Sequence, residues 1–160
     1  MFFHCPTPAR NQPIPLAAAV LALALVSPAS GETFKCAGLE VSVVAEDRAL
    51  ANRICSVAAT ALDRLSQCAL RQTRPFDIRV SQTLPSPFNG CFGVYHCADN
   101  SVEVLDPAAL SRAVEATGDF AQLPTDVLFD SLIVHEISHV LTDQSGLSDP
   151  RTSAEIEYIA

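Results

Sequence analysis

The sequence predicts an α+β domain in which a small mixed sheet packs against one long helix and a second helix carrying a His-Glu-x-x-His motif. Three observations support this prediction. Several short segments alternate apolar and polar side chains, as half-buried strands do. Residues 46–71 repeat apolar side chains every three or four positions, which is typical of an amphipathic helix. Residues 131–142 are strongly apolar yet contain two histidines and a glutamate within a single helical turn.

The chain begins with a predicted export signal. Arg10 supplies the positive charge, residues 15–26 form the apolar stretch, and small side chains suit cleavage after Ala29. The apolar run is shorter than the roughly 20 residues that a membrane-spanning helix needs, so cleavage is favoured over anchoring. We therefore expect a signal peptide at 1–29, a single domain at 30–160, and a secreted or periplasmic mature chain with no membrane partner.

The first half of the predicted domain contains two strands and the long helix. Residues 33–44 are predicted to form one strand because Leu39, Val41 and Val43 alternate with other residues. The helix at 46–71 follows, and packing against the sheet explains its apolar face better than a partner-binding role does. Residues 76–81 alternate apolar and polar side chains and form the next strand.

The second half supplies two more strands and two helices. The strands are expected at 91–95 and 101–105. A helix at 107–116 is capped by Asp106, with proline at its first position. The motif helix follows, with Thr125 as its expected cap.

The charge of the chain argues against nucleic acid as a partner. It has 10 Lys+Arg and 18 Asp+Glu, and only Arg10 lies in the leader, so the mature net charge is 9 − 18 = −9. No basic run is present. Phosphate backbones and anionic membrane surfaces bind to basic patches, so this surface is unsuited to both.

Five cysteines remain after cleavage, and export to an oxidising compartment makes disulfides the expected outcome. They are Cys36, Cys55, Cys68, Cys91 and Cys97. Two bridges among five cysteines can form in fifteen ways. Cys55 and Cys68 lie about 20 Å apart along one predicted helix, so they cannot pair with each other. The absence of a Cys-x-x-Cys pair argues against a zinc site built from cysteines.

The motif predicts a zinc site. His135 and His139 occupy positions i and i+4, so both imidazoles lie on one face of the helix. Glu136 lies about 100° further round, where it can act as a general base toward a water on the metal. Buried polar side chains are costly unless paired or metal-bound. A partly exposed helix with two incidental histidines is the alternative.

A catalytic zinc usually takes three protein ligands. Glu155 and Glu157 are the downstream candidates, on a short helix expected to begin after Asp149 and proline. They point about 200° apart on such a helix, so only one of them can face the metal. His96 is a further candidate, although a histidine in a loop is more often simply exposed.

At these residues the chain resembles the gluzincin class of zinc metallopeptidases, and most closely small secreted bacterial members of it. The similar pieces are 91–95 (Cys-Phe-Gly-Val-Tyr), 135–139 (His-Glu-Ile-Ser-His) and 157–160 (Glu-Tyr-Ile-Ala). The resemblance implies a zincin-like fold with one zinc ion. It makes Glu157 the third ligand and Glu155 the fallback. Members of the class normally continue beyond this point, so we expect the domain to be truncated at its C-terminus.

The expected function is that of a secreted zinc peptidase that hydrolyses peptide bonds with a metal-activated water. Glu136 would be the catalytic residue, and His135, His139 and Glu157 would bind the metal. By the same resemblance, the strand at 91–95 would border the cleft and hold an extended peptide or protein substrate. A catalytically inactive zinc-binding protein and a disulfide-stapled adaptor are the two alternatives. The sequence does not indicate an oligomeric state.

Overall fold

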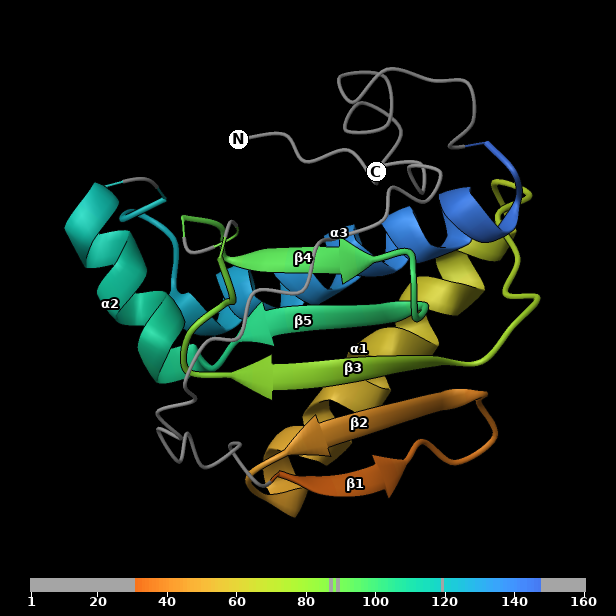
Figure 1. The fold of residues 1–160 in the computed structure, drawn as a ribbon, viewed down its shortest axis with the longest axis horizontal. Coiled ribbons are helices and arrows are strands. Elements are labelled where there is room, and N and C mark those ends of the chain that lie inside the picture. The colour runs from red at the N-terminus through yellow and green to blue at the C-terminus, as the bar shows by residue number, and fades with distance from the viewer. Residues whose placement is uncertain (1–30, 87, 89, 119, 148–160) are drawn as a thin grey trace, which may run out of the picture.

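The computed structural model describes residues 31–147 apart from residues 87, 89 and 119 (Figure 1). The predicted signal peptide and the predicted ligand helix with Glu155 and Glu157 lie outside the described residues. Within them, one five-stranded mixed sheet and three helices make up an α+β domain, as predicted.

The strands are arranged in the order β1-β2-β3-β5-β4. Their bounds are β1 Glu32–Lys35, β2 Val41–Ala45, β3 Phe76–Ser81, β4 Gly93–His96 and β5 Ser101–Leu105. The central strands β2, β3 and β5 are parallel, and the edge strands β1 and β4 run antiparallel to their neighbours. Because β4 is an edge strand, the backbone N–H and C=O groups along one of its sides do not pair with another strand of this sheet.

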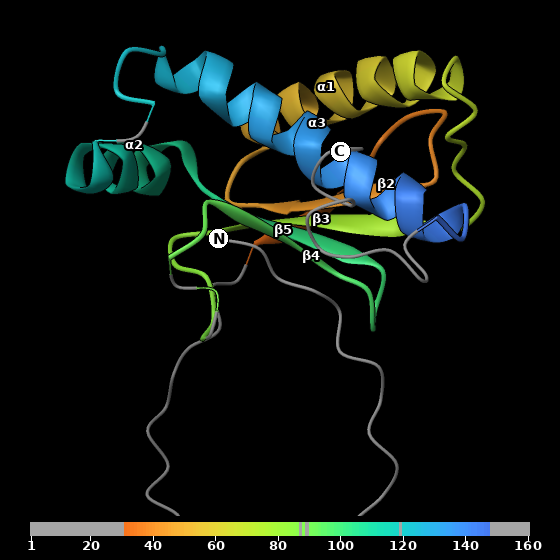
Figure 2. The same ribbon diagram turned by 90° about the horizontal axis from the view of Figure 1, so that it is seen from above.

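Helices α1 (Arg48–Ser66) and α3 (Thr125–Gln144) lie side by side on one face of the sheet, and α2 (Pro107–Thr117) lies near the ends of the strands (Figure 2). Alternate strand residues point toward α1 and α3. Val43, Ile78 and Val102 are fully buried beneath these helices. Each such side chain contributes about 1.5–3 kcal/mol by leaving water. This core fixes the depth and orientation of α3, the helix that carries the motif.

Two of the helices begin at acidic caps. Asp47 accepts a hydrogen bond from the backbone N–H of Leu50 at 2.8 Å, which starts α1. Asp106 does the same for Ala109 at the start of α2, as predicted. The predicted cap of α3 is wrong: Thr125 is already the first helical residue, and Pro124 precedes it without a side-chain cap.

The strand predicted at 33–44 is wrong in its extent, because the structure divides it into β1 and β2. A turn separates the two strands, and Gly38 adopts a φ of 75° in it, which is a conformation that glycine tolerates without strain. The predictions at 76–81 and 101–105 are confirmed. The strand predicted at 91–95 begins two residues later, at Gly93.

A disulfide joins Cys36, just after β1, to Cys55 on α1. The thiol of Cys68 is exposed and unpaired. No helix within the described part of the chain is long and apolar enough to cross a membrane.

Candidate metal centre on helix α3

Helix α3 brings the two histidines of the motif together as the i, i+4 spacing predicts. The Nε2 atoms of His135 and His139 lie 3.1 Å apart. The two rings stand nearly perpendicular, with an interplanar angle of 86° and centroids 4.6 Å apart. Both side chains are partly exposed, so the pair is accessible from outside the core.

This spacing fits two ligands of one zinc ion. Two nitrogens bound at 2.0–2.1 Å in a tetrahedral arrangement are separated by about 3.3 Å. The observed separation of 3.1 Å is close to that value. The pair therefore has the donor atoms and the spacing that a zinc ion requires, and His135 and His139 are the residues that would hold it.

The surroundings of His139 favour its neutral form. Burial, followed by the neighbouring charge of His135, lowers the pKa of His139 to about 4. Metals bind the neutral imidazole, because a protonated ring has no free lone pair.

Glu136 lies on the side of α3 that faces the edge strand β4. Its side chain is almost fully buried, with 4% exposed. Directly opposite it is Gly93, the first residue of β4. A carboxylate this deeply buried needs a structural or chemical role, because desolvation of the charged form is costly.

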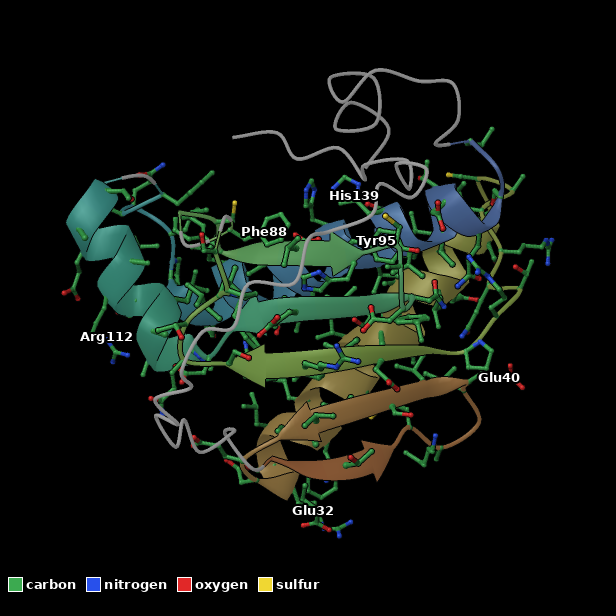
Figure 3. The ribbon with its side chains drawn as sticks, in the orientation of Figure 1. Glu32, Glu40, Phe88, Tyr95, Arg112 and His139 are labelled. Atoms are coloured by element: carbon green, nitrogen blue, oxygen red, sulfur yellow. A yellow bond between two sulfur atoms is a disulfide. The ribbon has the colours of Figure 1, made fainter. Side chains whose placement is uncertain are left out.

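Strand β4 therefore borders the candidate centre. Figure 3 shows His139 and Tyr95 close to the outer edge of this strand. The residues of β4 alternate, so Gly93 and Tyr95 face α3 while Val94 and His96 face the other side of the sheet. The structure places this strand beside the motif helix, and the substrate cleft expected there stays a prediction.

His96, the further candidate for the third ligand, is not brought to the histidine pair. Its Nε2 atom lies 3.4 Å from Glu103 Oε2, on the sheet face opposite α3. Glu103 also accepts a hydrogen bond from the hydroxyl of Ser81 at 2.5 Å. His96 therefore belongs to a polar cluster on the sheet face opposite α3.

The preferred third ligand, Glu157, and its fallback, Glu155, lie outside the described residues. Within the described ranges, no three His, Cys, Asp or Glu side chains are grouped closely enough to hold a metal ion. The third ligand thus stays a prediction, and so does the zinc site itself; the structure describes the positions of two of the three proposed ligands.

Sequence reasoning missed a hydrogen-bonded cluster at the C-terminal end of α3. The Tyr95 hydroxyl donates to Asp143 Oδ2 at 2.9 Å, and Arg74 approaches the same oxygen at 3.2 Å. Burial, followed by the hydrogen bond to Asp143, raises the pKa of Tyr95. No local spacing rule could reveal the cluster, because its members lie far apart in the sequence.

Residues 41–160 match a family of unknown function, DUF6639. The chain belongs to this family. The match covers all three helices, both histidines and Glu136. Searches of curated proteins and of solved structures find no match. The assignment to DUF6639 brings no activity with it, so the functional argument rests on the geometry of α3 and β4.

Proposed function

We propose that this DUF6639 protein is a zinc-dependent peptidase with a zincin-like domain. One observation supports the proposal most strongly. The Nε2 atoms of the two histidines lie 3.1 Å apart, and the buried Glu136 directly follows the first of them in the sequence. Two imidazoles and a general base on one turn of helix form the arrangement that metallopeptidases of this kind use. His135, His139 and Glu157 are the proposed ligands.

A bound zinc ion would polarise the scissile carbonyl and increase the acidity of a water molecule. Glu136 is the proposed general base: an Oε atom takes a proton from the attacking water and returns it to the departing amine. Its burial between α3 and β4 keeps bulk water away, which strengthens electrostatic interactions at that carboxylate.

The proposed substrate is a peptide or protein in extended conformation. Edge strand β4 offers main-chain groups with which such a segment could pair as an added strand. The Cys36–Cys55 disulfide supports a secreted or periplasmic site of action, because such bonds persist in oxidising compartments.

The experiment uses the secreted full chain, metal analysis and cleavage of a peptide library. Glu136→Gln removes the base and leaves both imidazoles, so we expect at least a hundredfold loss of cleavage with zinc content unchanged. His139→Ala should lose the zinc as well as the cleavage. Glu115→Gln, the same change on the exposed face of α2, is the matched control and should retain both.

Two outcomes would contradict the proposal. A chain that binds one zinc ion but cleaves nothing in the library would be an inactive zinc-binding protein. A chain that holds no stoichiometric metal would fit the disulfide-stapled adaptor, and His139→Ala would then alter local packing only.

A further inference from the structure

Gly93, in edge strand β4, lies against the proposed general base. A Cβ atom added at Gly93 would lie 2.8 Å from Glu136 Oε1 and 3.1 Å from Glu136 Cγ. It would also lie 3.0 Å from Leu132 Cδ1. The closest of these distances is shorter than real Cβ contacts allow, so an alanine here must displace something.

Backbone conformation does not explain this glycine. Gly93 pairs with Val104 in the regular β4–β5 ladder, whereas positive φ values occur at Gly38, Gly118 and Gly146. Glycine inside a strand weakens it and often marks a site where another group approaches closely. The group that approaches here is the carboxylate of Glu136.

The displacement would fall on the carboxylate itself. Glu136 Oε1 is the far end of a flexible side chain, so it gives way more readily than a backbone atom would. Its surroundings are nevertheless closed, because only 4% of Glu136 is exposed. Movement away from β4 therefore changes the position of the carboxylate relative to His135 and His139.

We infer that Gly93 is a positioning residue of this site, and that its missing side chain leaves the space in which Glu136 is held as the base. The inference rests on the proposed peptidase function. A displacement of about 1 Å at a reacting group can cost about a hundredfold in rate. The effect should fall on kcat more than on KM, because proton transfer is altered while the edge of β4 is kept.

The test is a double-mutant cycle between Gly93→Ala and Glu136→Asp in the full chain. Gly93→Ala alone should lower kcat by about 10- to 100-fold, with zinc content unchanged. Glu136→Asp shortens the side chain by one methylene and should lower kcat on its own. In that background Gly93→Ala should cost less than about threefold, because the shorter side chain no longer meets the added methyl group.

The chain offers a matched control in Gly31→Ala. Its added Cβ would also be crowded, at 2.9 Å from Val44 Cγ1, but at the β1–β2 end of the sheet. It should lower stability without lowering kcat. The same cycle measured by unfolding of the metal-free proteins should show coupling between residues 93 and 136, independently of any substrate.

The results separate this inference from the proposed function. Wild-type cleavage together with full activity of Gly93→Ala would overturn the inference and leave the peptidase standing. An equal loss from Gly93→Ala in the wild-type and Glu136→Asp backgrounds, or no coupling in unfolding, would also overturn it. A wild-type chain without peptidase activity would overturn both proposals together.

Discussion

At the scale of single residues, Thr142 on α3 is the residue of the described core that most clearly lowers the stability of the fold. Its side chain is fully buried, and its Oγ1 atom has no hydrogen-bond partner within the described structure. A buried hydroxyl without a partner costs about 1–3 kcal/mol. Thr142→Val removes the hydroxyl at nearly constant shape and similar helix propensity.

We therefore expect Thr142→Val to raise the free energy of unfolding by about 1 kcal/mol, as measured by urea denaturation. Ser138→Ala is the control, one turn earlier on the same helix. Its hydroxyl donates to the carbonyl of His135, so its removal should bring no gain. Equal or lower stability of Thr142→Val would mean that the hydroxyl is satisfied in solution.

At the candidate centre, the sequence was enough to predict the histidine pair but not the contact between Gly93 and Glu136. The pairing of His135 and His139 follows from helix geometry alone, so the motif sufficed to predict it. The contact between Gly93 and Glu136 depends on β4 being packed against α3, which lies far along the chain. A glycine within Phe-Gly-Val carries no local sign of that neighbour, so the sequence could not identify it.

At the scale of elements, the C-terminal end of α3 is clamped to the segment before β3. Gln144 Oε1 accepts hydrogen bonds from the backbone N–H groups of Thr73 at 2.7 Å and Arg74 at 3.0 Å. Tyr95 on β4 binds the neighbouring Asp143. These contacts hold the last turn of α3, directly after His139, against both the sheet edge and the preceding loop.

Tyr95→Phe tests this clamp. It removes the hydroxyl that donates to Asp143 and preserves the ring, so we expect a loss of about 1–2 kcal/mol in the free energy of unfolding. Arg79→Gln is the comparison, because it breaks the exposed ion pair with Asp99 and should cost less than about 0.5 kcal/mol. Equal effects of the two substitutions would show that the clamp contributes no more than a surface ion pair.

The elements themselves were predictable wherever local periodicity determined them. The ranges of β3 and β5 and the cap of α2 follow from alternation and capping residues. The division between β1 and β2 was missed because Leu39 lies in the turn next to Gly38, yet it continues the apolar alternation of Val41 and Val43. The strand order β1-β2-β3-β5-β4 depends on long-range pairing, which periodicity does not encode.

At the scale of the whole molecule, the domain has two parts that share the central sheet and also meet where α1 packs against α3. One part is the β1–β2 hairpin with α1, which the disulfide fastens together. The other is α3 with edge strand β4, where the candidate centre lies. The sequence predicted a mixed sheet packed against one long helix and the motif helix. It could not assign the bridge, because five cysteines allow fifteen pairings and folding decides among them.

The disulfide should therefore stabilise the molecule without shaping the candidate centre. Cys36 and Cys55 are 19 positions apart, and closing a loop of this size constrains the unfolded chain by about 3 kcal/mol. We expect the double substitution Cys36→Ala and Cys55→Ala to lower the free energy of unfolding by about that amount, measured by urea denaturation. Cys68→Ala, which removes an exposed free thiol, is the control and should change stability little. Below its unfolding transition the double variant should still bind zinc with unchanged stoichiometry, since the histidines lie on a different helix. Loss of zinc binding in the folded variant would show instead that the two parts depend on each other.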